Sequence, residues 1–278
     1  MQRVLRIEHK EEHIRGITIS FMVMKQSIFL CIFAFLFQDA LSQQIGIKRC
    51  YIFSISDTIK PTPPEDFRAF LAFYSNGDYS LDLFASLTDD LAVEINLSYG
   101  CYNQENRTIE LTDDCYGYKM YFHLTDEDCL IASQSFPFLN NRKSYQGDLP
   151  TSTPLTSWQK AQQPSVQKIL KECYSHNQKY KKKYKKKFKN MPLPIGRYAG
   201  ISTGTPLYLH LQSENTFSYY IKDMLVLCGE WSRNGNILQL KDSVLQQTFY
   251  APIYKNGISG IYFPGGWNSF FKYKSTEK

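Results

Sequence analysis

The chain lacks the short motifs that assign a chemistry to a protein. It contains no C-x-x-C pair, no H-E-x-x-H helix and no glycine-rich phosphate loop. Histidine is scarce as well, because only His123, His176 and His210 follow the N-terminal region, and they stand too far apart to suggest a metal set. We therefore predict no metal, no cofactor and no catalytic residue from motifs.

A long apolar run is also missing. The most apolar stretch, residues 28–37, has ten residues, whereas a helix needs about 20 to cross the hydrocarbon core of a bilayer. Residues 24–27 form a short basic start before it, and Ala40 and Ser42 follow it, which is the layout of a secretory signal peptide. We expect residues 1–42 to be a leader that is cleaved after Ser42, with export to the periplasm or the outside.

A strong charge spread over the whole chain is absent. The formal net charge of +6 is small, so long-range steering of an anionic partner is not expected. The basic excess is local, because eight lysines are concentrated in residues 179–189. They are Lys179, Lys181, Lys182, Lys183, Lys185, Lys186, Lys187 and Lys189.

These lysines belong to a predicted amphipathic helix. Apolar residues from Val166 to Phe188 fall on one face at a period of 3.6, which predicts a helix over about residues 165–189 that ends before Pro192. A basic amphipathic helix can contact an anionic membrane surface or another polyanion. The alternative is a linker helix whose aromatic stripe packs on a β unit while its lysines stay in water. Nucleic acid fits the charge but conflicts with export, so we expect no nucleic-acid partner.

Six cysteines follow the leader, and an even number in an exported protein allows disulfides. Cys101 and Cys115 flank a predicted hairpin, and a bridge between them is a candidate that would stabilise the fold by about 3 kcal/mol. Connectivity is not determined by the sequence, and some of the six are equally well explained as small buried hydrophobes.

Aromatic residues are abundant, with 20 Tyr and 19 Phe, which favours strands. One pattern of turns and strands occurs twice, in residues 73–113 and 211–242. From Gly100 and Gly229 to Asp113 and Asp242 the two copies keep a constant offset of 129 residues, whereas Tyr79 and Phe217 are 138 apart. We predict a duplicated β unit with nine extra residues in the first copy, within residues 87–95.

The predicted fold class is mainly β, with two related antiparallel meander or part-barrel units joined by one long basic amphipathic helix. We expect β domains at residues 46–135 and 194–278, each burying its own aromatic layer. A loop and the helix fill residues 136–193, because residues 135–157 show no period and the helical pattern follows them.

The second copy resembles the exported lipocalin-like β-meander domains common in Bacteroidetes-type bacteria. The residues that carry the resemblance are Gly196-x-Tyr198, Phe217, Gly229-x-Trp231 and Leu238-x-Leu240. The resemblance covers about 80 residues, mainly 194–278, and implies a β-meander fold and export. It implies no catalytic set.

Carboxylates cluster at Asp89-Asp90, Asp113-Asp114 and Asp126-Glu127-Asp128. Paired acids could serve glycoside hydrolysis or collect calcium. Each cluster falls at a predicted turn, however, where local hydrogen bonding favours aspartate. We prefer the turn interpretation.

These observations favour an exported, non-catalytic binding or structural protein, which could hold a small apolar ligand against a concave aromatic face. One alternative is a hydrolase acting on envelope or other polysaccharide. A second is a protein that docks on an anionic surface through the lysine-rich helix.

Overall fold

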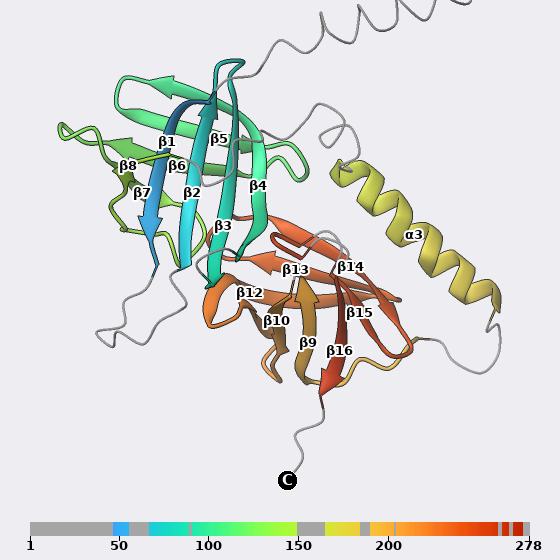
Figure 1. The fold of residues 1–278 in the computed structure, drawn as a ribbon. Coiled ribbons are helices and arrows are strands. Elements are labelled where there is room, and N and C mark those ends of the chain that lie inside the picture. The colour runs from blue at the N-terminus through green and yellow to red at the C-terminus, as the bar shows by residue number, and fades with distance from the viewer. Residues whose placement is uncertain are drawn as a thin grey trace, which may run out of the picture. The chain divides into compact units, whose positions relative to one another are not determined.

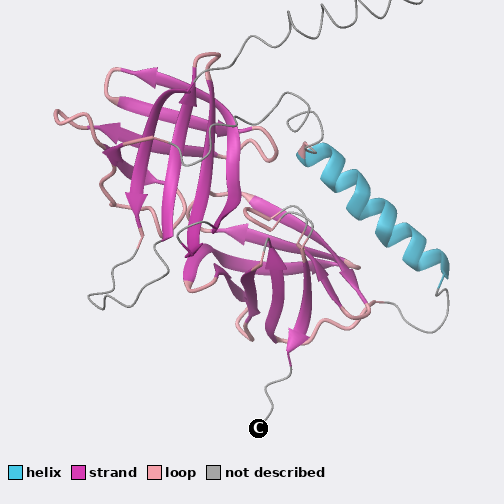
Figure 2. Ribbon diagram, viewed as in Figure 1, coloured by secondary structure: helices cyan, strands magenta, loops and turns pink. Residues whose placement is uncertain are grey.

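The structure is a computed structural model that describes residues 47–55, 67–88, 91–148, 165–183, 190–202, 204–260, 263–266 and 269–274. These residues form mostly β-strands, in two eight-stranded antiparallel sheets, and the described part has one helix (Figures 1 and 2). The predicted fold class is therefore confirmed. No helix within these ranges is long and apolar enough to cross a membrane. The predicted leader and the Asp89-Asp90 pair lie outside the described residues.

The first sheet has the strand order β7-β6-β5-β4-β3-β2-β1-β8. Residues 140–146 connect its two edges, because Lys143 pairs with Ile131 of β7 and Tyr145 of β8 pairs with Ile52 of β1. The sheet thus curls back onto itself. Its strands are β1 (Ile47–Ser54), β2 (Phe67–Tyr74), β3 (Asp78–Thr88), β4 (Leu91–Glu105), β5 (Thr108–Asp113), β6 (Lys119–Leu124), β7 (Leu130–Gln134) and β8 (Tyr145–Gln146).

Strand β8 lies in a segment that the sequence predicts to be loop. A two-residue strand is too short to show alternation, so its sequence carries no period-2 signal. Pairing with β1, which is distant in the sequence, is what gives this segment its extended conformation.

The second sheet is a closed barrel in which β16 pairs with β9. Along β10 the burial alternates, with Leu207, Leu209 and Leu211 inside and Tyr208 and His210 outside. The strands are β9 (Gly196–Ser202), β10 (Thr205–Leu211), β11 (Thr216–Ile221), β12 (Met224–Asn234), β13 (Ile237–Asp242), β14 (Thr248–Tyr254), β15 (Gly257–Ser259) and β16 (Phe270–Lys274).

The predicted duplication is present in the backbone hydrogen bonds. The β4–β5 hairpin of the first copy and the β12–β13 hairpin of the second have the same register. Gly100 lies opposite Asp113 in the first, and Gly229 lies opposite Asp242 in the second. Three backbone N–H···O bonds of the first copy have an equivalent in the second. In the first copy the N–H groups of Tyr102, Asp114 and Asp113 donate to the carbonyl oxygens of Gly77, Tyr99 and Tyr118. In the second copy those of Trp231, Ser243 and Asp242 donate, in the same order, to Asn215, Cys228 and Gln247. The repeat is therefore structural and extends beyond the residues that reveal it in the sequence.

The repeated glycines are explained by a close approach of two backbones. A Cβ at Gly100 would lie 2.0 Å from the carbonyl oxygen of Thr112, and one at Gly229 would lie 2.1 Å from that of Lys241. No side chain fits at either position, because the neighbouring backbone would have to move.

The extra residues of the first copy lengthen one hairpin. Strands β3 and β4 have 11 and 15 residues, whereas their equivalents β11 and β12 have 6 and 11. The insertion thus continues the β ladder and keeps the register of the repeated part.

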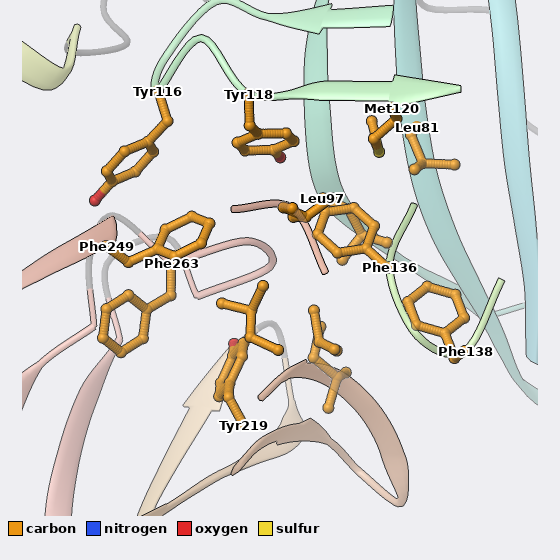
Figure 3. Close-up of a cluster of buried hydrophobic side chains, with 14 of the residues drawn as sticks. Leu81, Leu97, Tyr116, Tyr118, Met120, Phe136, Phe138, Tyr219, Phe249 and Phe263 are labelled. Carbon is orange, nitrogen blue, oxygen red and sulfur yellow. The ribbon is translucent and has the colours of Figure 1, made fainter. Parts of the chain in front are cut away.

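Buried side chains of both sheets form one hydrophobic cluster (Figure 3). The ring of Phe249 in β14 packs against Tyr116 and Tyr118, which lie between β5 and β6, with centroid distances of 4.6 and 6.0 Å. The backbone N–H of Tyr250 donates to the Tyr116 hydroxyl at 3.4 Å. The expectation that each copy buries a separate aromatic layer is wrong, because the two copies share a core.

Candidate functional site

The lysine-rich helix is α3 (Val166–Lys183), and it packs on β13 and β14 of the barrel. Among its described side chains, those of Ile169, Cys173, Asn177 and Tyr180 are buried, and their spacing of four, four and three places them on one face. Residues 190–194 are not helical, so the helix ends before Pro192 as predicted. Residues 184–189, which hold part of the predicted helix, lie outside the described residues.

The buried face differs from the predicted apolar stripe at two places. Tyr174 is 49% exposed, whereas the polar residues His176 and Asn177 lie against the barrel. Nε2 of His176 is 3.0 Å from the carbonyl oxygen of Ile253, and its ring lies 4.4 Å from that of Tyr254. The helix therefore docks through hydrogen bonds as well as apolar contact.

Asn177 contacts the turn between β12 and β13. Its Oδ1 accepts the backbone N–H of Asn236 at 3.2 Å. Gly235, with φ of 62°, lies under the same side chain, and a Cβ there would be 2.7 Å from Nδ2 of Asn177. Glycine suits this position for two reasons: it adopts the positive φ of the turn without strain, and it leaves room for the Asn177 side chain.

Asn236 connects this contact to the segment after the helix. It is fully buried, and its Oδ1 accepts the N–H of Met191 at 2.7 Å and the Arg233 guanidinium at 3.2 Å. Arg233 also donates to the carbonyl oxygen of Met191. We name Asn177, Arg233, Asn236 and Met191 the helix seat.

Sequence reasoning missed the helix seat. A signal was available, since Asn177 is four residues after Cys173 and therefore falls on the apolar face. A polar residue at such a position needs a buried partner.

The described lysines of α3 point away from the barrel. Lys179, Lys182 and Lys183 are exposed, as are Lys168 and Lys171. The side chain of Lys181 and all of Lys185, Lys186, Lys187 and Lys189 lie outside what the structure describes. Three of the eight predicted contact lysines are thus placed on a solvent-facing helix surface.

The acidic clusters have local partners. Oδ1 of Asp113 accepts the backbone N–H groups of Cys115 and Tyr116 at 3.0 and 2.7 Å, and Asp242 holds its own turn in the same way. The second described cluster is held by partners on neighbouring strands and loops: Arg107 for Asp126, Lys143 for Glu127, and the Tyr51 hydroxyl for Asp128. The turn interpretation is confirmed for Asp113. Among the described residues no metal-holding group of three or more His, Cys, Asp or Glu side chains occurs.

Asp113 is also part of a buried polar network. The Ser98 hydroxyl donates to its Oδ2 at 2.8 Å, and the Tyr79 hydroxyl lies 2.7 Å from that of Ser98. Burial raises the pKa of the Asp113 carboxyl to about 6, although its hydrogen bonds act in the opposite direction. Solvent does not reach this carboxyl, which is 4% exposed.

The candidate bridge between Cys101 and Cys115 is not formed in the structure. Cys101 is exposed and Cys115 is buried, and both carry a thiol. Burial raises the pKa of the Cys115 thiol, which disfavours the reactive thiolate.

A pocket of about 550 Å³ lies beside β1 and β8. Lys48, Arg49 and Asp148 line it together with the buried Cys50. Burial raises the pKa of the Cys50 thiol to about 12. The charged residues that line the pocket are two cations, Lys48 and Arg49, and one acid, Asp148.

The fold and the exposed lysines of α3 define the class of protein: it is mainly β, with two eight-stranded sheets and a cationic helix docked on the second sheet. No protein-family model matches the chain, and no curated protein is similar to it. Among solved structures, a Nostoc punctiforme protein of unknown function from the DUF3598 family is similar over 82% of this chain and 94% of its own. The identity is 13% and the TM-score 0.16, so this likeness supports no argument about function. Membership of the lipocalin-like group stays a prediction.

Proposed function

We propose that this is an exported, non-catalytic binding protein that attaches to an anionic surface or polyanion through α3. One observation carries the proposal: the barrel occupies one face of α3, and the described lysines on the other faces are exposed. A helix docked in this way presents its charges from a rigid support. It can bind without the ordering cost of a free peptide.

Binding on the outside is favoured because the barrel is filled by its own side chains. Tyr198, Phe217, Tyr219, Phe249 and Phe271 are at most 1% exposed. A small apolar ligand inside the barrel would have to displace these rings, among which Tyr219 and Phe271 pack edge to face.

The hydrolase alternative receives no support from the acids that suggested it. Asp113 and the acids of residues 126–128 have local partners, and Asp113 is shielded from solvent. Glycoside hydrolysis requires two carboxyl groups that face one sugar.

Retention on immobilised heparin tests the proposal. We expect the protein to bind and to elute with salt, and we expect Lys179→Gln/Lys182→Gln/Lys183→Gln to elute at clearly lower salt. A matched control is Lys48→Gln/Lys119→Gln/Lys241→Gln, which changes the net charge equally on other surfaces. Equal elution of the two variants would overturn the role of α3. Release of reducing sugar from a polysaccharide panel, lost in Asp114→Asn, would favour the hydrolase.

A further inference from the structure

Two exposed aromatic rings lie next to the lysine-rich helix on the outer surface of the barrel. Tyr254 of β14 and Phe270 of β16 are 39% and 37% exposed, with ring centroids 5.7 Å apart. The ring of His176 on α3 lies 4.4 Å from that of Tyr254. The aromatic pair is thus joined to the flank of the helix by a direct contact.

Exposed lysines follow His176, Tyr254 and Phe270 closely along the helix and the strands. Lys179 and Lys183 follow His176 by three and seven residues, so they lie on the same flank of α3. Lys272 follows Phe270 by two residues on the outer face of β16 and is exposed, as is Lys255 beside Tyr254. This flank of the described helix also has an acidic residue, Glu172, one turn before His176.

A soluble polyanion and an anionic bilayer use these groups differently. Lysines attract both partners, and the attraction falls with salt. Exposed aromatic rings add little to the contact with a sulfated or phosphorylated chain. At a bilayer surface, however, they sit favourably among the headgroups.

We propose that the described lysines of α3 and the Tyr254–Phe270 pair form one docking surface for an anionic lipid bilayer. This inference rests on the proposed function of α3, and it adds the partner class and the aromatic contact. Stacking on single-stranded nucleic acid is less favoured, because the two rings meet edge to face at 61° and do not form a flat platform.

Co-sedimentation with vesicles tests the inference, with phosphatidylserine and phosphatidylcholine mixed in one set and phosphatidylcholine alone in the other. We expect binding to the anionic set only. Tyr254→Ser/Phe270→Ser should weaken it by about tenfold and leave heparin elution unchanged. Lys179→Gln/Lys182→Gln/Lys183→Gln should weaken binding to anionic vesicles and to heparin by more than about tenfold. Glu172→Gln should strengthen binding to vesicles and to heparin.

The aromatic control is Tyr145→Ser, which removes a ring of similar exposure, 42%, from the first sheet. Circular dichroism of each variant checks that the fold is kept. An aromatic variant that binds vesicles like the wild type would overturn the bilayer inference and leave the lysine contact standing. Lysine variants without effect in either assay would overturn both proposals. Tighter binding to single-stranded nucleic acid or heparin than to anionic vesicles would also contradict a bilayer partner.

Discussion

At the scale of single residues, a glycine and an aspartate are common to the two copies of the repeat, Gly100 and Asp113 in the first and Gly229 and Asp242 in the second. A glycine allows two backbones to approach, and an aspartate closes the following turn with its carboxyl oxygens. The equivalent positions around them have diverged, because Tyr79 and Ser98 of the first copy correspond to Phe217 and Leu227 of the second. The polar network around Asp113 is therefore a property of the first copy.

Gly100→Ala should destabilise the protein by about 1–3 kcal/mol, because the new methyl group would overlap the Thr112 carbonyl oxygen. Urea unfolding followed by circular dichroism measures the change. Cys101→Ala, at the exposed neighbouring position, should stay within about 0.5 kcal/mol of the wild type. Two variants of equal stability would contradict the close approach.

Asp113 should make stability depend on pH in an unusual direction. Its pKa is raised from 3.8 to about 6, so between these values the native state binds more protons than the unfolded chain. Stability from this group is present below about pH 4 and is lost as the pH rises through 6, by up to about 3 kcal/mol.

The measurement compares unfolding of the wild type and Asp113→Asn at pH 4 and pH 7. We expect the difference between their free energies of unfolding to shift against the wild type at the higher pH. A difference that does not change with pH would show that Asp113 titrates normally.

At the scale of elements, the helix was largely predictable and its docking was not. Its period and its stop before Pro192 are local signals. The choice of Asn177 over Tyr174 as a buried residue depends on the β12–β13 turn, which is more than 50 residues away in the sequence. Strand β8 was missed for a similar reason.

Asn177→Ala should destabilise the protein by about 1–3 kcal/mol, since it leaves the buried Asn236 backbone N–H without its partner. Gln178→Ala, at the exposed next position, is the control and should be close to neutral. Thermal unfolding and the rate of proteolysis within α3 report the effect. An Asn177→Ala protein as stable as the control would mean that the helix seat contributes little.

On the scale of the whole molecule, the shared core predicts one cooperative unfolding transition for both sheets. Phe249→Ala removes the ring that packs on Tyr116 and Tyr118 and should cost about 3–5 kcal/mol. Far-UV circular dichroism and tyrosine fluorescence should give coincident transitions in the wild type and in the variant. Two resolved transitions in the wild type would show that the sheets are stabilised separately.

Export of the whole chain is a prediction that rests on the leader, residues 1–42. Expression in a secreting host should yield a protein whose N-terminus, measured by intact mass, is Gln43. Changing Leu30 and Phe33 to aspartate should block export, because the apolar region of the leader would be interrupted. Export without cleavage would contradict the predicted site.

The sequence by itself determined the mainly β class, the duplication with its offset, the extra residues of the first copy and the amphipathic helix. All of these depend on local periodicity, on turn residues or on comparison of one segment with another. Only the tertiary structure decided the closure of the first sheet, the shared core around Phe249, the helix seat and the aromatic pair beside α3. These depend on contacts between residues far apart in the chain, and such contacts leave no period in the sequence.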